Sequence, residues 1–380
     1  MTNTAGDTAS GPRLFEPARL GPLPLPNRLV MAPMTRNRAA ADGTPQPVMA
    51  TYYAQRASAG LIIAEASTPN PVGQTYPNIT ALHSDAHVAG WRQVTDAVRA
   101  AGGRMFVQVQ HGGRIGHPDT SGLTPVAPSA VPLPGMIFTP GGHQPSVTPR
   151  EMTPAEIRST VADFAAAARR AVDAGFEGVE VHGANGYLLH QFLAKGTNRR
   201  TDAYGGSAAG RIRFVVEVVR AVADAIDAER VGLRISPGLT VNGIDEGGET
   251  ETNSVYAALI DALAGAGLAY LHIVYADPDQ PLFRTLREAW PGALIANPGL
   301  PGVTTDDVTR RGGRLLAAGA DLIAFGRPFL ANPDLVARLR LGAPLNPVRD
   351  EGLMYVGGEA GYTDYPALTE VSAGHPVPIG

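Results

Sequence analysis

Cysteine is absent from this sequence, and lysine occurs once, at Lys195. Without cysteine the chain can form no disulfide, no thiolate metal site and no iron–sulfur cluster. The formal net charge is −4, so the excess of positive charge that nucleic-acid-binding and membrane-surface proteins carry is also missing. No uninterrupted apolar run reaches transmembrane length, and the first dozen residues lack the basic start and apolar core of a signal peptide. We therefore expect a soluble cytoplasmic protein without a nucleic-acid or membrane partner. The sequence does not distinguish a monomer from a homodimer.

The length of 380 residues suits one large α/β domain or two smaller ones. Residues 1–12 are small and polar and are predicted to be disordered. Residues 13–366 are predicted to form a single domain, with a short N-terminal hairpin over the Pro- and Leu-rich residues 14–27. Residues 367–380 are predicted to be a C-terminal tail without an assigned role.

Strand-like and helix-like segments alternate through the rest of the chain. The expected strands are Arg28–Thr35, Leu61–Glu65, Met105–His111, Gly178–His182, Val231–Pro237, Leu268–Tyr275, Ala293–Pro298 and Leu322–Arg327. The expected helices are 46–59, 86–101, 154–174, 208–228, 252–266, 281–289, 304–318 and 329–341. Eight strand–helix units in one chain of this size predict a (β/α)8 TIM barrel, an α/β fold.

One connection breaks this rhythm. Residues 112–152, between the third strand and its helix, are crowded with Gly and Pro and have few periodic apolar positions. A connection of this length is uncommon in a compact domain and usually has a role. We expect a lid or excursion near the active face; the alternative is a passive surface loop.

Polar residues occupy positions that a barrel should fill with branched apolar side chains. Alternate residues of a strand point to opposite faces, so the inward positions can be read from the sequence. Four successive strands direct polar side chains inward near their C-terminal ends: Gln108 and Gln110, Glu180 and His182, Arg234 and Ser236, and His272. Buried charges and amides are costly without partners. We expect a polar ligand on the barrel axis; the alternative is a self-satisfied network, for example Glu180 paired with Arg234.

The seventh and eighth strands each end in glycine and run into a helix, in Ala296-Asn-Pro-Gly299-Leu300 and Ala324-Phe-Gly326-Arg327-Pro328. These two strands of a barrel commonly hold a phosphate through backbone N–H groups. The guanidinium of Arg327 adds a fixed positive charge suited to phosphate oxygens. The pattern therefore predicts a phosphorylated cofactor whose head group lies across Gln108 and Arg234.

The fourth strand ends in three side chains of different chemistry. His182 closes the strand, Asn185 lies on the turn that follows, and Tyr187 opens an apolar helical run. In a parallel α/β protein this strand-to-helix junction is where ligands bind. The three residues are thus predicted to face the cofactor. His190, eight residues after His182, is expected to be structural.

The segment His182-Gly-Ala-Asn185-Gly-Tyr187-Leu-Leu-His-Gln-Phe-Leu resembles the Old Yellow Enzyme family of FMN-dependent ene-reductases. The resemblance covers nearly the whole chain. Further segments similar to the family follow its order: Met31–Arg36, Gln108–Arg114, Asn198–Ser207 with Arg211, Ala324–Leu335 and Gly361–Pro366.

The resemblance implies roles for individual residues. Tyr187 is the implied proton donor, and His182 and Asn185 are implied to bind the carbonyl or nitro oxygen of the substrate. Implied contacts of tightly bound, non-covalent FMN are Pro33, Met34, Thr35, Ala66, Gln108, Arg234, Gly299, Leu300, Gly326 and Arg327. Implied pocket residues are Tyr76, Gln110 and Tyr355. No metal is implied.

The implied activity is that of a flavin-dependent oxidoreductase. NAD(P)H would reduce FMN, and the flavin would pass a hydride to the β carbon of an activated alkene, such as an enone, enal, maleimide or nitroalkene. A nitro compound or nitrate ester reduced at the same site is the alternative substrate class. Many relatives carry an aromatic residue at the position of Gln110, so the substrate preference of the family does not transfer to this chain.

Three rival functions use other features of the sequence. Lys195 could form a Schiff base in an aldolase-type barrel, provided that it lies in a dry pocket. His111 and His182 could belong to a metallohydrolase, although no carboxylate stands at a convincing spacing. A non-catalytic FMN-binding or storage protein would share the cofactor site but would not turn over NAD(P)H.

Overall fold

The structure is a computed structural model that describes residues 13–299 and 304–368. The predicted disorder of residues 1–12, the predicted FMN contact Leu300 and most of the predicted tail, residues 369–380, lie outside the described residues. The side chain of residue 351 is likewise not described. Among the helices that the structure describes, none is long and apolar enough to cross a membrane.

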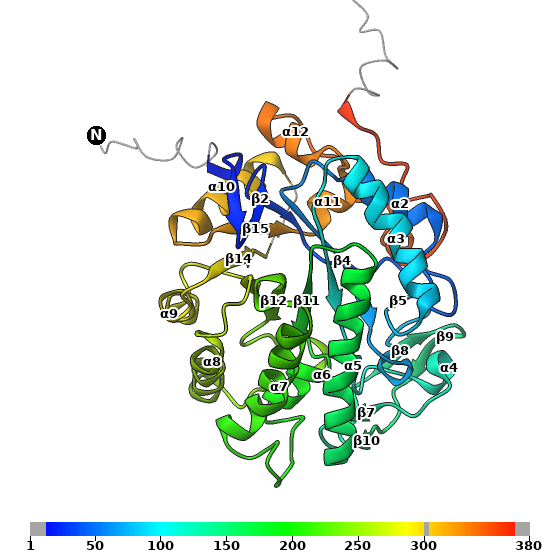
Figure 1. Cartoon of the computed structure of the whole chain (residues 1–380), viewed down its shortest axis with the longest axis vertical. Coiled ribbons are helices and arrows are strands. Elements are labelled where there is room, and N and C mark those ends of the chain that lie inside the picture. Colours follow the sequence, from blue (N-terminus) through cyan, green and yellow to red (C-terminus); the bar gives the residue numbers. More distant parts are fainter. Residues whose placement is uncertain (1–12, 300–303, 369–380) are drawn as a thin grey trace, which may run out of the picture.

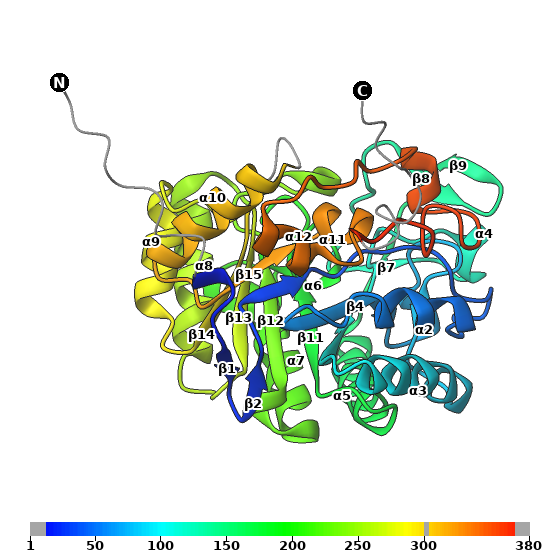
Figure 2. The same ribbon diagram turned by 90° about the horizontal axis from the view of Figure 1, so that it is seen from above.

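Eight parallel strands close into a barrel at the centre of the molecule (Figures 1 and 2). In spatial order they are β3 (Leu29–Met31), β4 (Leu61–Thr68), β6 (Met105–Val109), β11 (Gly178–Gly183), β12 (Val231–Ile235), β13 (Tyr270–Val274), β14 (Ala293–Asn297) and β15 (Leu322–Phe325). Pairing of β15 with β3 and of β3 with β4 completes the ring. The predicted (β/α)8 barrel is confirmed.

Helices surround the barrel (Figure 1). They are α2 (Pro47–Ala54), α3 (Asp85–Ala100), α5 (Pro154–Asp173), α6 (Leu188–Leu193), α7 (Ala208–Ile226), α8 (Glu249–Leu263), α9 (Pro281–Ala289), α10 (Thr305–Ala317), α11 (Arg327–Ala331) and α12 (Leu335–Leu341). Short 3₁₀ turns are η1 (Pro71–Gly73), η2 (Ala228–Arg230), η3 (Val241–Gly243) and η4 (Glu351–Met354).

The predicted helix 329–341 is wrong, because two helices occupy this segment. α11 ends at Ala331 and α12 begins at Leu335. Asn332 between them has extended backbone angles, φ −131° and ψ 95°. The following Pro333 explains the break, since proline has no N–H to continue the helical ladder and disfavours helical angles in the residue before it.

The N-terminal hairpin was predicted and is confirmed. β1 (Ala18–Leu20) pairs antiparallel with β2 (Leu23–Leu25). Leu20 and Leu25 pack with Phe106, Tyr270 and other inward-facing residues at the N-terminal ends of the barrel strands. The hairpin thus closes the bottom of the barrel with apolar side chains, and the opposite end is left for the polar residues.

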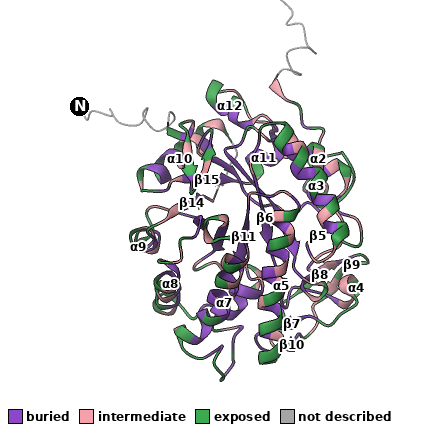
Figure 3. Cartoon of the chain, in the orientation of Figure 1, coloured by how far each residue is buried: buried purple, intermediate pink, exposed green. Residues whose placement is uncertain are grey.

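Strand alternation separates two environments, as the sequence predicts. Val107, Val181 and Leu233 pack outward into the large apolar layer between barrel and helices. Gln108 and Arg234, which alternate with them, face the interior and line a cavity there. Both faces of the strands are buried, while solvent reaches the outer faces of the helices (Figure 3).

The connection at residues 112–152 carries secondary structure of its own. It contains α4 (Pro118–Ser121), β7 (Val126–Ala127), β8 (Met136–Thr139), β9 (Gly142–Pro145) and β10 (Arg150–Glu151). β8 and β9 form an antiparallel hairpin, β7 and β10 pair in parallel, and β5 (Thr80–Ala81) extends the barrel sheet beside β4. The hairpin lies at the rim of the barrel (Figure 1). Its closing as a lid stays a prediction.

Candidate active site

Two adjoining cavities open at the C-terminal ends of the barrel strands, with volumes of about 700 Å³ and 450 Å³. Most of the predicted site residues line one or both. The larger cavity is lined by Pro33, Met34, Thr35, Tyr76, Gln108, Gln110, His182, Asn185, Tyr187, Arg234, Gly326, Arg327 and Tyr355. Gly299 lines the smaller one, which shares Pro33, Met34, Asn185, Tyr187, Arg234, Gly326 and Arg327 with it.

Ala66 is a predicted contact that the structure does not bring into the site. It is buried in β4, its carbonyl oxygen accepts a hydrogen bond from the Thr80 hydroxyl at 3.1 Å, and it lines neither cavity. The strand continues to Thr68, beyond the predicted end at Glu65, so this residue sits within the sheet. The cavity is lined on this side instead by residues 33–35, which follow the short strand β3.

The turn after β11 holds Asn185 in a defined position. Asn185 has φ +56°, a left-handed conformation that asparagine tolerates better than most residues. Its backbone N–H donates to the Ser236 hydroxyl at 2.8 Å, and its carbonyl oxygen accepts from the Asn242 side-chain amide at 2.8 Å. Tyr187 follows as the N-cap residue of α6. Hydrogen bonds to neighbouring loops thus fix the backbone of the turn, and Asn185 and Tyr187 line the cavity.

His182 and Tyr187 lie side by side, with ring centroids 5.1 Å apart. Burial and the positive charge of Arg234 lower the pKa of His182 well below its usual value, so the imidazole is neutral. Burial and the neighbouring Tyr76 hydroxyl raise the pKa of Tyr187 well above its usual value, so its hydroxyl keeps its proton. The site therefore offers a neutral N–H donor and a protonated hydroxyl at neutral pH.

The floor of the larger cavity is a buried polar network. The Gln108 Nε2 group donates to Glu180 Oε1 at 2.7 Å, and His272 Nδ1 lies 2.7 Å from Glu180 Oε2. Arg234 Nη2 donates to Asn297 Oδ1 at 2.8 Å. Glu180 is thus satisfied by Gln108 and His272, and Arg234, the partner named as an example for a self-satisfied network, bonds instead to Asn297 of β14.

Among the described residues, three buried polar atoms in or beside this network have no protein partner: Nε of Arg234, Nδ1 of His182 and Nε2 of His272. The first two belong to residues that line the larger cavity. An unsatisfied buried group of this kind is costly in a stable fold and marks a place where a ligand atom can bind. With Gly299 and Arg327 at the far end, the site fits FMN, which combines a polar ring edge with a phosphate.

The upper wall of the cavity contains residues that the sequence did not predict. Phe138 and His143 come from the β8–β9 hairpin, with ring centroids 5.4 Å apart, and Met354 and Val356 come from the C-terminal segment. A polar or aromatic residue near a hairpin tip was the available signal for the first two. The others depend on a long-range contact that no local pattern encodes.

Arg36 and Arg38 fasten that C-terminal segment to the barrel. Arg36 donates to the carbonyl oxygens of Met354 at 3.0 Å and Gly361 at 2.7 Å, and Arg38 donates to that of Leu353 at 2.8 Å. We call these two arginines the clasp. Through the clasp, residues that follow β3 determine where Tyr355 stands.

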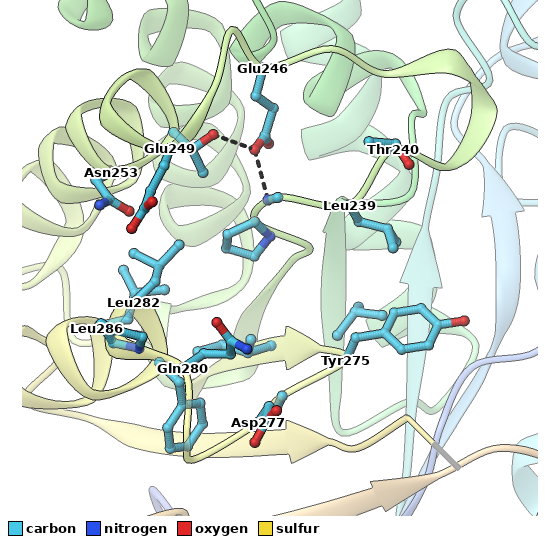
Figure 4. Close-up of a pocket in the computed structure, with 18 of the residues that line it drawn as sticks. Leu239, Thr240, Glu246, Glu249, Asn253, Tyr275, Asp277, Gln280, Leu282 and Leu286 are labelled. Atoms are coloured by element: carbon cyan, nitrogen blue, oxygen red, sulfur yellow. Dashed lines mark hydrogen bonds between the residues drawn. The ribbon is translucent and has the colours of Figure 1, made fainter. Parts of the chain in front are cut away.

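A third hollow of about 770 Å³ lies between the loops after β12 and β13, outside the predicted site. Figure 4 shows Glu246, Glu249 and Asp277 around it. None of the described residues that line it is cationic, and several are acidic, so a phosphate would be repelled there. Tyr275 stands between this hollow and the 450 Å³ cavity.

The residues of the rival functions do not form sites. Lys195 is exposed and lines none of the cavities, so it lacks the dry pocket that a Schiff-base lysine requires. His111 is buried outside the cavities, and the described part of the chain holds no cluster of three or more metal-ligating side chains. His190 is buried against Glu246 at 2.7 Å, which agrees with the structural role expected for it.

Comparison with known proteins agrees with this geometry. Residues 13–346 match the model of the NADH:flavin oxidoreductase / NADH oxidase family. The chain belongs to this family. Within it, the chain is of the Old Yellow Enzyme type, as the sequence motifs predict.

Several Old Yellow Enzyme relatives match over nearly their whole length. A probable flavin mononucleotide-dependent alkene reductase of Leishmania infantum is 41% identical over 93% of this chain and 97% of its own. The 12-oxophytodienoate reductase 7 of Oryza sativa subsp. japonica is 35% identical, covering 93% and 94%. The structure of morphinone reductase in complex with tetrahydroNAD is 45% identical, with a TM-score of 0.87 over 93% and 97% of the two chains.

Proposed function

We propose that this protein is an FMN-dependent ene-reductase that uses a nicotinamide dinucleotide to reduce the double bond of an activated alkene. The observation that carries the proposal is the convergence of His182, Asn185 and Tyr187 above a floor formed by Gln108 and Arg234, in one cavity. When bound, FMN supplies the hydride chemistry, accepting a hydride from NAD(P)H and passing one to the alkene. The phosphate end would be held by Gly299, Gly326 and Arg327.

His182 and Asn185 bind the activating oxygen of the substrate in this proposal. A neutral imidazole N–H and an amide N–H both donate hydrogen bonds, and both gain strength as negative charge develops on a carbonyl or nitro oxygen. Donors fixed in a buried site polarise the double bond without reorganising during the reaction. The neutral state of His182 matters here, because an imidazolium would have to be buried beside Arg234.

Tyr187 supplies the proton. Its hydroxyl holds that proton at neutral pH, and the ring lies against His182, next to the place where the activating oxygen would be bound. General acid catalysis by a positioned hydroxyl typically accelerates a step by about 10²–10⁴. Protonation at the α carbon by Tyr187 Oη completes the reduction.

The names of relatives support the same reaction class. Three relatives are named as a probable flavin mononucleotide-dependent alkene reductase, a chanoclavine-I aldehyde reductase and a morphinone reductase in complex with tetrahydroNAD. The compounds in these names are said of those proteins; the shared reaction class is what supports the proposal for this chain. The choice between NADH and NADPH is decided by the experiment below.

The test is a spectrum of the purified protein followed by anaerobic turnover. We expect flavin absorbance, bleaching by NADH or NADPH, and recovery of the absorbance on adding cyclohexenone, a maleimide or a nitroalkene. A protein that stays colourless after incubation with FMN would exclude the proposal. A flavin that the nicotinamide reduces but that no alkene reoxidises would contradict the ene-reductase activity, although the protein would still bind flavin.

A further inference from the structure

The side-chain amide of Gln108 stands between Glu180 and the cavity. Its nitrogen donates to Glu180 Oε1 at 2.7 Å, and the residue also lines the cavity. Among the described residues, the amide oxygen accepts no hydrogen bond. The two ends of this amide therefore serve different partners.

The chemistry of Glu180 decides which end faces the cavity. An ionised carboxylate has only acceptors, so the amide atom that bonds to it must be the NH2 group. Burial alone would raise the pKa of Glu180, but His272, Arg234 and Gln108 together hold it below its usual value, and the side chain is ionised. The oxygen of Gln108 is then the end that remains for a ligand.

Glu180 cannot easily be replaced in this role by another side chain. Its second oxygen lies 2.7 Å from His272 Nδ1, so it accepts hydrogen bonds on both branches at once. An amide in the same place has only one acceptor branch, so its NH2 group must face either Gln108 or His272. Facing Gln108, it would reverse that amide; facing His272, it would require the imidazole to accept at Nδ1 and carry its proton on Nε2. Both Glu180 and His272 are fully buried, so solvent cannot take the place of either contact.

We propose that Glu180 is a positioning residue that holds the Gln108 amide with its oxygen toward the cavity, where it accepts the N3–H group of the FMN ring. The proposal rests on the flavin function proposed above. The pyrimidine edge of flavin carries one N–H donor between two carbonyl acceptors. A floor that offers an acceptor on Gln108 beside the donors of Arg234 complements that pattern, and a ring without an N–H at this place would not be held as well.

The test compares FMN with 3-methyl-FMN, in which the N3–H group is replaced by N–CH3. Full-length protein freed of flavin is titrated with each, and quenching of flavin fluorescence gives the two dissociation constants. We expect the wild-type protein to prefer FMN by at least about tenfold, the equivalent of one charge-assisted or well-placed hydrogen bond. Glu180→Gln should reduce that preference to about threefold or less.

A second readout follows the N3–H group directly. With FMN labelled with ¹⁵N at N3, the proton resonance should lie downfield in the wild-type protein, as for a strong hydrogen bond, and move upfield in Glu180→Gln. Loss of fold alone would not produce this change in a protein that still binds flavin.

Glu246→Gln is the matched control. Glu246 is another buried glutamate paired with a histidine at 2.7 Å, but it does not contact Gln108 or line either flavin cavity. This variant should keep the wild-type preference for FMN over 3-methyl-FMN, even if it is less stable.

Two results would overturn the inference. One is a folded Glu180→Gln protein with the wild-type preference and the wild-type N3–H resonance. The other is a Gln108→Leu protein that still prefers FMN, which decides the matter even if Glu180→Gln does not fold. Wild-type protein that binds neither FMN nor 3-methyl-FMN would refute the proposed function itself. Normal flavin binding, with the same preference for FMN over 3-methyl-FMN in Glu180→Gln as in wild type, would refute only the role of Glu180.

Discussion

Two fully buried glutamates on barrel strands, Glu180 and Glu65, have pKa values that are shifted in opposite directions. Glu180 in the cavity floor has its pKa held below the usual value, because His272, Arg234 and Gln108 offset its burial. Glu65 has a pKa raised to about 7 by burial, which hydrogen bonds and the charge of Arg36 offset only in part. Its carboxylate accepts from Arg36 N at 3.2 Å and from the Tyr53 hydroxyl at 3.1 Å.

This difference in pKa shows which of the two buried carboxyl groups stays ionised at neutral pH. The floor under the proposed flavin site stays ionised across the physiological pH range, so its donor and acceptor pattern is constant. The carboxyl group under the clasp changes its charge near neutrality. Binding of the cofactor should therefore be insensitive to pH in that range, and the stability of the clasp region should not be.

Arg234→Met should give the largest effect, because it removes charge from the floor. The substitution deletes the donors that face the cavity and removes a positive charge that helps to offset the burial of the Glu180 carboxylate. We expect FMN affinity to fall by at least about 100-fold, measured by fluorescence titration.

Arg200→Met is the control for that variant. Arg200 is also buried and donates to the carbonyl oxygens of Pro128 and Met152, away from both flavin cavities. It should destabilise the fold without changing the affinity of the folded protein for FMN. Unchanged FMN affinity in Arg234→Met would contradict the assignment of the floor.

Glu65→Gln should change how stability depends on pH. The folded pKa of about 7 lies above the ordinary value of 4.5, so the wild-type protein gains stability from this group at low pH and loses it as pH rises from 4.5 through 7. The loss amounts to about 3 kcal/mol in the free energy of unfolding and should be absent from the variant. Urea unfolding at a series of pH values from 5 to 8 measures it. Parallel curves for the two proteins would show that Glu65 does not titrate in this range.

Gln110→Leu should give the smallest effect on the cofactor. Gln110 lies on the same face of the chain as Gln108, two residues on, but its amide has only a long contact of 3.4 Å to the Thr75 hydroxyl and no carboxylate partner. We expect FMN affinity within about threefold of wild type, while KM for different alkenes shifts by larger and unequal factors. A loss of FMN affinity as large as that expected for Arg234→Met would show that Gln110 binds the cofactor as the floor residues do, and would contradict its assignment to the substrate pocket.

Much of the barrel and its floor follows from sequence pattern. The alternation of side chains along the strands correctly placed Gln108, His182 and Arg234 in the interior. The pattern is decisive because a shift by one residue would place these polar side chains in the outer apolar layer. The strand-to-helix junction and its three side chains were found in the same way. The break of helix 329–341 was also readable, since Pro333 stands in its middle.

The rest could not be read from the sequence for physical reasons. The partners of Glu180 depend on the register between strands, in which Glu180 lies beside Gln108, and Arg234 lies beside both His182 and His272. Several other side chains could reach the second oxygen of the carboxylate, and packing brings His272, two strands away, to it. The wall residues Phe138 and Met354 come from segments more than 200 residues apart, brought together by the β8–β9 hairpin and the clasp.

The most direct test of the central claim separates the two half-reactions in Tyr187→Phe by anaerobic stopped-flow spectroscopy. In the proposed mechanism the floor residues bind the cofactor, and Tyr187 delivers the proton. Reduction of the flavin by the nicotinamide should stay within about threefold of wild type, and reoxidation by an enone should slow by about 100-fold or more. Equal losses in both half-reactions, or an unchanged rate of reoxidation, would contradict the account.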